Sequence, residues 1–394
     1  MKSNYRYIVK AFMAMAVIAG TTSCDDFLDR EPMSSISPET YYSTAAQLEA
    51  NLNDEYPNVL PSFGQWTYGI FGEDKGTDNQ IEVNANDRYT QDRWKVPHSE
   101  SDNWKFERIY RINFFLSEAL PKFGEDMSGS QNTISGSVAT IKHYIGEMYF
   151  LRAYEYFKKL QLFGDFPIID QPLADEMEAL REASKRFPRN EVARFIISDL
   201  DKAYAYMSDV DMATTRINKD AAMLVKSRVA LFEATWLQNF KGTAFVPGGE
   251  GWPGASLHNN YQYPSGNLDN EVKYFLEQAV EASKLVADKY KGNLTENTGV
   301  LQQSADDPSN PYFDMFAQED LSDVKEVLLW RQYARGLSTH NINAAAGRGN
   351  YRIGLTRGFV QNFLMKDGTP VYAHGSYADG DGYYMGDKTV ADVR

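Results

Sequence analysis

The sequence contains a single cysteine, Cys24, among its 394 residues. One cysteine cannot form a disulfide within the chain, so no covalent cross-link supports the fold. Stability must therefore come from packing, and hydrophobic residues make up 43% of the chain and aromatic residues 13%. The length suits one large domain or two ordinary ones.

Positive charge is also scarce. Lysine and arginine number 40 against 54 acidic residues, which gives a formal net charge of -14. No run of basic residues exceeds two, as at Lys158 and Lys159. Because an acidic surface repels phosphates and anionic lipid headgroups, the composition argues against nucleic acid as a partner. Any contact with a membrane must come from a feature other than surface charge.

Motifs for catalysis or metal binding are missing. The five histidines show neither an HExxH motif nor another close ligand spacing, and there is no G-x-S-x-G elbow. The stretch "YADGDGYYMGD" (377–387) resembles a calcium loop, but Tyr384 stands where glycine is expected and the closing glutamate is absent. We predict a protein without cofactor, metal or catalytic residues. A glycan hydrolase stays an alternative, because 54 acidic residues include many possible carboxylate pairs.

Long apolar runs are absent, apart from "AFMAMAVIAG" (11–20), which follows Lys2, Arg6 and Lys10. A membrane-spanning helix needs about 20 apolar residues, and this run is too short. A basic start, a short apolar run and small residues are typical of a signal peptide, which we predict over residues 1–23. Its removal takes away three positive charges and no negative charge, so the net charge becomes -17.

Cys24 lies where cleavage is expected, so we predict that its thiol carries a diacylglycerol that anchors the mature chain. Two or more acyl chains hold a protein at a membrane stably, whereas one holds it only marginally. The usual lipoprotein signal has leucine three residues before the cysteine, and this chain has Thr21 there. The alternative is an ordinary free cysteine.

Helical periodicity dominates the rest of the chain. Apolar residues recur at steps of three and four, which predicts helices with one apolar stripe facing the core. Leu224 and Val280 are among the residues of these predicted stripes. The predicted helices lie within residues 44–56, 104–120, 141–169, 191–207, 221–236 and 272–290. Thr44 and Gln47 have the spacing of a capping box, and Gly164 is expected to end the third helix. Helix pairs without comparable strand patterns suggest a solenoid, in which Ala153 and Phe157 are spaced as in a tetratricopeptide repeat.

The central helix, "FLRAYEYFKKLQLFGDFPI", resembles the signature of the SusD/RagB family of outer-membrane nutrient-binding lipoproteins, the starch-utilisation-system D-like proteins. Further segments resemble other family blocks in the family's order, namely "SCDDFLDREP", "YYSTAAQLEANLNDEYP", "WKFERIYRINFFLSEAL", "RINKDAAMLVKSRVALFEATW" and "TRGFVQNFLMKDGTPVY". The resemblance implies a mainly α fold, in which tetratricopeptide-like helix pairs form a right-handed superhelical scaffold and irregular loops and short helices carry the ligand face. It also implies one SusD-like domain over 24–394 that is C-terminally incomplete, because family members continue well past Arg394.

The resemblance further implies a lipid-anchored protein on the cell surface that captures glycans and delivers them to a TonB-dependent, SusC-like transporter in the outer membrane. Asp25 and Asp26 fit the family's surface-export pattern, in which acidic residues follow the anchor. Two alternatives stay open: a lipidated helical scaffold for outer-membrane assembly, and a RagB-like member that binds peptides.

Two loops have the composition of a sugar site, because sugars stack their C–H faces on aromatic rings and need polar partners for their hydroxyls. The first, 61–94, offers Trp66, Tyr68 and Trp94, together with Tyr89, Asp78, Asn79 and Asn86. The second, 246–267, offers Trp252, Tyr261 and Tyr263, together with His258, Asn259 and Asn260. An aromatic side chain can instead pin such a loop to the protein body. Aromatic residues in helices, such as Trp236, are expected in the core.

Overall fold

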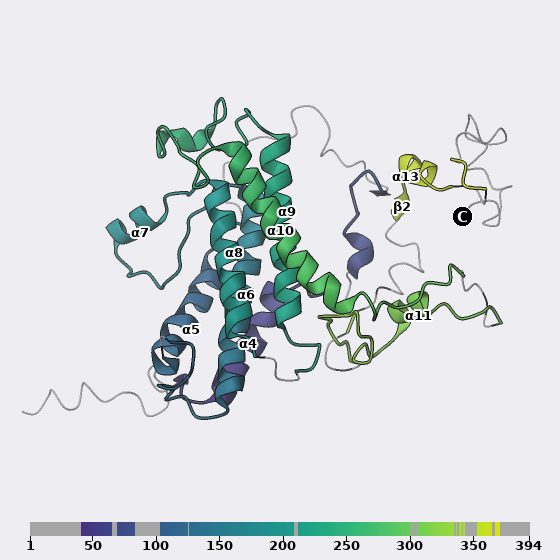
Figure 1. Cartoon of the computed structure of the whole chain (residues 1–394), viewed down its shortest axis with the longest axis horizontal. Helices are drawn as coiled ribbons and strands as arrows, with labels where there is room; N and C mark the ends of the chain where they lie inside the picture. The colour runs from purple at the N-terminus through teal and green to yellow at the C-terminus, as the bar shows by residue number, and fades with distance from the viewer. Residues whose placement is uncertain are drawn as a thin grey trace, which may run out of the picture.

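The structure, a computed structural model, describes residues 41–64, 69–82, 103–124, 126–208, 212–300, 304, 306–334, 336, 339–340, 342, 353–364 and 367–370. Cys24 and the predicted signal peptide lie outside these residues. The described chain is mainly helical and its longer helices lie side by side in one bundle, so the predicted fold class is confirmed (Figure 1).

The bundle begins with α4 (Ala45–Val59) and α5 (Glu107–Phe123), which both pack against α6. At the start of α4, the Thr44 hydroxyl accepts a hydrogen bond from the Gln47 backbone N–H at 3.3 Å. The Gln47 side chain accepts one from the Thr44 N–H at 3.0 Å. The predicted capping box is therefore confirmed. Leu48 and Leu52 face the core from α4, as their spacing predicts.

The central helix is α6 (Val138–Phe163), which is buried nearly all round because α4 and α5 cover one part of its surface and α8 another. It ends at Gly164, whose φ of +68° is a conformation that suits glycine. Gly146 lies at the contact with α8, where an added Cβ would come within 2.8 Å of the Met207 backbone nitrogen. Glycine at this position thus permits the close approach of the two elements.

The next three helices, α8 (Arg189–Tyr206), α9 (Lys219–Asn239) and α10 (Leu268–Tyr290), pack in sequence order, each on the one before it. This arrangement agrees with the predicted helix pairs. Arg189 at the start of α8 and Glu233 in α9 form a buried ion pair at 2.9 Å. Such a pair joins the two helices through charge as well as apolar contact.

The predicted apolar stripes are wrong in part for α9 and α10, because Leu224 in α9 and Val280 in α10 are exposed. The buried face of α9 instead includes small residues such as Ala230, together with Lys226 and Glu233. Small side chains allow close helix packing, and ionic partners on α8 satisfy the two buried charges. The periodic pattern placed Leu224 in the core because it takes no account of close packing by small side chains or of ion pairs between helices.

The remaining elements are short: η1 (Gly69–Gly72), β1 (Gln80–Glu82), α7 (Met177–Ala183), η3 (Pro253–Ser256), α11 (Pro311–Ala317), β2 (Ile353–Leu355) and α13 (Arg357–Gln361). Strands β1 and β2 pair antiparallel, with Ile81 opposite Gly354. Figure 1 shows α11, β2 and α13 on one side of the bundle and α7 on an arm that projects from the other side. The two ends of that arm meet where Phe166 and Phe187 exchange backbone hydrogen bonds of 3.2 and 3.0 Å.

No helix among the described residues combines the length and apolar character needed to cross a bilayer.

Candidate functional site

The second predicted loop folds over the joint between α6 and α8. Trp252 is only 5% exposed, and its indole N–H donates to Asp165 Oδ2 at 2.7 Å. The other Asp165 oxygen accepts the backbone N–H of Arg189 at 2.9 Å. Burial raises the pKa of Asp165. Trp252 therefore attaches the second loop to the end of α6, and its ring is not accessible to a ligand in this structure.

Tyr261 and Tyr263 are half-buried, and their rings pack edge to face with 5.1 Å between centroids. The Tyr261 hydroxyl exchanges hydrogen bonds with the side chain of Asn190 at 2.9 and 3.1 Å. The Tyr263 hydroxyl donates to the Pro247 carbonyl. Burial raises the pKa of both tyrosines, so they stay neutral. Both rings are fixed while part of each surface faces solvent.

His258 shares this cluster, since its ring stacks on Trp252 and its Nε2 lies 2.8 Å from the Arg186 carbonyl. Asn259 and Asn260 are exposed beside it. The second loop thus presents polar side chains next to rigid rings. Trp236, assigned to the core from sequence, is half-buried and packs against the hydrophobic core.

The first predicted loop is described only at residues 61–64 and 69–82, so Trp66, Tyr68 and Trp94 lie outside the described residues, as do Tyr89 and Asn86. The described part contacts residues 353–356 rather than the second loop. The Thr356 N–H donates to the Asn79 carbonyl at 2.9 Å, and the Thr356 hydroxyl donates to the Asp78 carbonyl. The two loops lie apart in Figure 1, one above the bundle and the other beside it.

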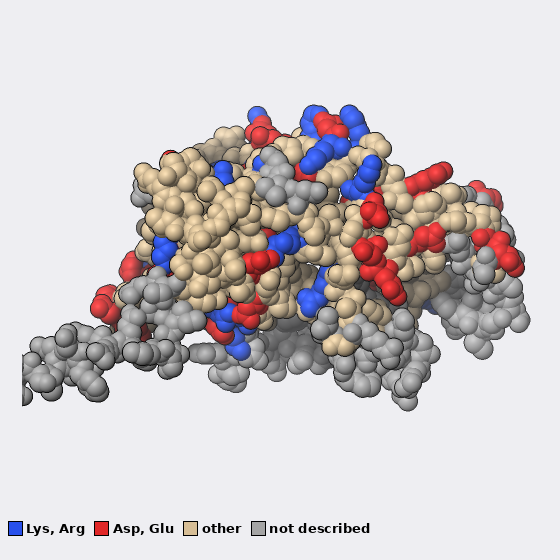
Figure 2. Space-filling model, turned by 90° about the horizontal axis from the view of Figure 1, so that it is seen from below, with Lys and Arg blue, Asp and Glu red and all other residues tan. Residues whose placement is uncertain are grey.

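The structure contains a polar pocket near α11 that was not predicted from the sequence. Its volume is about 470 Å³, and its lining includes Asn293, Asp314, Gln318 and Asp323. Carboxylate and amide groups accept hydrogen bonds from sugar hydroxyls. Figure 2 shows acidic side chains gathered on this side of the molecule.

Exposed aromatic rings accompany this pocket on the same short helix. Tyr312 and Phe316 pack edge to face at 5.2 Å, and Phe316 is 72% exposed. The signal that could have revealed them is "PYFDMFA", an aromatic-rich helix too short to bury all its rings.

No group of three His, Cys, Asp or Glu side chains in the described part of the chain is arranged to hold a metal ion. The predicted calcium-like stretch, 377–387, lies outside that part.

Residues 26–231 match the SusD-like_3 family, which is described as "Starch-binding associating with outer membrane". The chain belongs to this SusD-like family. The match begins two residues after Cys24 and ends within α9, so it includes α6, the helix that carries the predicted signature.

This SusD-like chain is 25% identical over 253 residues to SusD-like protein P2 of Formosa agariphila. The aligned region covers 61% of this chain and 46% of that protein. SusD-like protein P25 of the same organism is 25% identical over 233 residues, 54% of this chain and 41% of that protein. The chain thus spans less than half the length of these curated relatives.

A solved SusD-like carbohydrate-binding protein from Bacteroides fragilis matches with a TM-score of 0.50 and 14% identity, over 86% of this chain and 57% of the other. At that identity, the match shows the shared fold alone.

Proposed function

We propose that this SusD-like protein binds glycans at the cell surface and passes them to a partner TonB-dependent, SusC-like transporter. The observation that carries the proposal is the family match over 26–231, whose description names starch binding and the outer membrane. The description of the Bacteroides fragilis protein as carbohydrate-binding supports the same ligand class. We further propose that the protein acts by binding alone, without catalysis.

We propose that the ligand contacts come from loop aromatics. Tyr261 and Tyr263 are candidates because their rings are held in place and partly exposed. Trp66, Tyr68 and Trp94 are candidates because the described part of their loop is joined to residues 353–356, on the side of the bundle where α11 lies (Figure 1). The polar pocket at α11 supplies hydrogen-bonding groups on that side.

The test is affinity electrophoresis of the purified protein through gels that hold plant, host or microbial polysaccharides. We expect at least one polysaccharide to retard the protein, and we expect Trp66→Ala to reduce the retardation about tenfold in apparent affinity, since stacking on an aromatic ring contributes on the order of 1 kcal/mol or more. The matched control is Tyr110→Ala, which removes an exposed ring from α5, outside both predicted loops in the sequence. Thermal melts of all variants show whether folding is kept.

Retardation by no polysaccharide, from a protein that melts cooperatively, would contradict glycan capture and favour the peptide-binding or scaffold alternative. Release of new reducing ends during the incubation would contradict binding without catalysis. Equal loss of retardation in Trp66→Ala and Tyr110→Ala would show that the effect is not specific to the first loop.

We also propose that Cys24 carries the lipid anchor, with residues 1–23 as the signal peptide and 24–394 as the mature domain. Since two or more acyl chains give stable attachment, Cys24→Ser is expected to move most of the protein from the membrane fraction to the soluble fraction. Fractionation followed by mass spectrometry of the N-terminal peptide measures both effects. Ser23→Ala is the matched control, because it changes the neighbouring hydroxyl and keeps the thiol. Membrane retention of Cys24→Ser equal to that of the original protein would rule out this anchor.

A further inference from the structure

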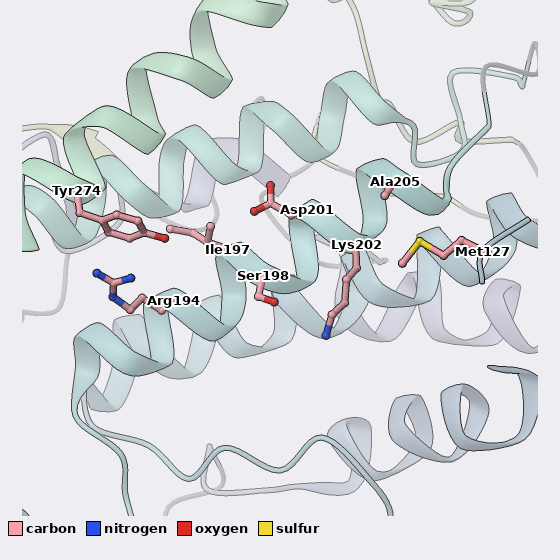
Figure 3. Close-up of a pocket in the computed structure, with 8 residues that line it drawn as sticks. All are labelled: Met127, Arg194, Ile197, Ser198, Asp201, Lys202, Ala205 and Tyr274. Atoms are coloured by element: carbon pink, nitrogen blue, oxygen red, sulfur yellow. The ribbon is translucent and has the colours of Figure 1, made fainter. Parts of the chain in front are cut away.

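A groove of about 360 Å³ runs along the exposed side of α8, and neither Tyr261 nor Tyr263 lines it. Figure 3 shows Arg194, Ile197, Ser198, Asp201 and Lys202 of α8 along it, with Tyr274 of α10 at one end. Met127, from the connection between α5 and α6, lies at the other end. The groove therefore has walls from three separate parts of the chain, and its size falls in the range of small-ligand sites.

One end of the groove is an aromatic surface held in a fixed position. The guanidinium of Arg194 lies 3.7 Å from the centroid of the Tyr274 ring. Arg194 is itself held by Glu271 through two hydrogen bonds of 2.7 and 2.8 Å, and by the Ser265 hydroxyl at 2.7 Å. In Figure 3 the Tyr274 hydroxyl points along the groove toward Ile197 and Asp201. A ring held in this way offers a stacking surface to a sugar at little entropic cost.

The middle of the groove carries Lys202, whose positive charge is only weakly compensated. Its side chain is 42% exposed, and Nζ lies 3.8 Å from Asp199 Oδ1. Asp199, however, is fully buried and already receives two hydrogen bonds from Arg152, at 2.6 and 2.8 Å. The carboxylate that faces Lys202 is therefore largely neutralised by another cation.

The other charged residues of the groove have close partners. Arg194 is paired with Glu271, and Asp201 Oδ1 accepts a hydrogen bond from Lys226 at 2.7 Å. Among the described side chains that line the groove, Lys202 is thus the cation best placed to attract an anion. Binding of an anion here has to be local, because the chain's net charge of -14 repels anions at long range.

We propose that this groove is a binding site for an acidic oligosaccharide. One sugar ring stacks against Tyr274, and a carboxylate or sulfate of the next sugar pairs with Lys202. Ser198 and Lys202 lie about one helical turn apart, roughly 6 Å along the α8 axis. The sugar hydroxyls between the stacked ring and the acidic group therefore contact Ser198 and the exposed part of Asp201. The site rests on the proposed glycan-binding function, but its lining does not include the loop aromatics and it defines a charged ligand class.

The test is isothermal titration calorimetry of the full chain in detergent with three probes: trigalacturonate, a mannuronate trisaccharide and a sulfated chondroitin tetrasaccharide. We expect at least one probe to bind. Binding of trigalacturonate or the mannuronate trisaccharide, which carry no sulfate, assigns the carboxylate as the recognised group. Chondroitin carries a uronate carboxylate as well, so binding of the third probe alone assigns the sulfate only if the same tetrasaccharide without sulfate does not bind. Binding of none overturns the proposal.

Lys202→Met is expected to weaken binding of the acidic probe about tenfold or more, because a hydrogen bond between charged groups is lost. It should also reduce the salt dependence of the dissociation constant. Lys273→Met is the matched control, since Lys273 is an exposed lysine on α10 that pairs with Glu277 at 3.7 Å and does not line the groove. The control should change the affinity less than twofold. Equal effects of the two variants would overturn the proposal.

A second variant, Ser198→Trp, places a large side chain in the groove from an exposed position on α8, so it should fold and block the site. Neither variant should change the retardation by a neutral polysaccharide that depends on Trp66. If neutral glycans bind and the acidic probes do not, this inference fails and the proposed function stands. If a folded protein binds neither kind, both fail.

Discussion

Replacing Arg152 by methionine is expected to lower the free energy of unfolding by about 3–5 kcal/mol, the usual cost of removing one partner of a buried ion pair. Arg152 lies in the middle of α6 and is almost fully buried. Its guanidinium donates twice to Asp199 of α8, once to the Asn113 side chain of α5 at 2.9 Å, and once to the Asp170 carbonyl at 2.9 Å. One side chain thus connects three helices and the start of the α7 arm.

The cost comes from what methionine leaves behind. Asp199 stays buried with only Lys202 nearby, and the Asn113 side-chain oxygen loses its donor. Methionine replaces most of the volume, so the effect measures lost polar contacts rather than a large cavity. Urea denaturation followed by circular dichroism gives the free energy.

The matched control is Arg181→Met in α7, where the arginine is 75% exposed and lies 3.9 Å from Glu178. Exposed pairs contribute about 0–1 kcal/mol, so this variant should unfold near the midpoint of the original protein. If both substitutions shift the midpoint equally, the buried network is not the source of the effect.

Gly146→Ala is expected to destabilise the protein by about 1–3 kcal/mol, although the same change in an ordinary helix interior stabilises by roughly 0.5–1 kcal/mol. The added methyl would lie 2.8 Å from the Met207 backbone nitrogen and 2.9 Å from the Ala203 carbonyl oxygen. Backbone atoms cannot rotate away as a flexible side chain can. The end of α8 must therefore move, and the core between α6 and α8 loosens.

Gly292→Ala serves as the control, because an added Cβ there meets nothing within 4 Å. Differential scanning calorimetry of both variants should show a lower melting temperature for Gly146→Ala and an unchanged or higher one for Gly292→Ala. An increase for both would mean that α6 and α8 do not approach as closely as described.

The sequence predicted local features well, because local contacts determine them. The capping box at Thr44 needs only Gln47 three residues later, and the end of α6 needs only the freedom of Gly164 to adopt a positive φ. The arrangement of helix pairs followed from periodicity together with the family resemblance. The capping box and the helix end depend on residues within one or two turns of each other.

The site was harder to predict because its contacts join distant parts of the chain. Trp252 has the loop setting of a ligand-binding residue, but its partner Asp165 lies 87 positions away and holds it in the interior. Tyr274 follows a helical pattern that suggests the core, but the course of α8 leaves it at the end of a groove. Sequence identified aromatic residues in polar loops, and tertiary contacts decided which rings are accessible.

The backbone hydrogen bonds between Phe166 and Phe187 fix the two ends of the α7 arm, so the length of the arm can change without moving the helices of the bundle. Because the two ends are already joined, residues can be added near the exposed Met177 without pulling on α6 or α8, and each doubling of a flexible loop costs only about 0.6 kcal/mol. The arm therefore offers a place for a peptide epitope or a fluorophore. A label there would report whether the folded domain is accessible at the cell surface, as proposed, while leaving the candidate binding surfaces unmodified.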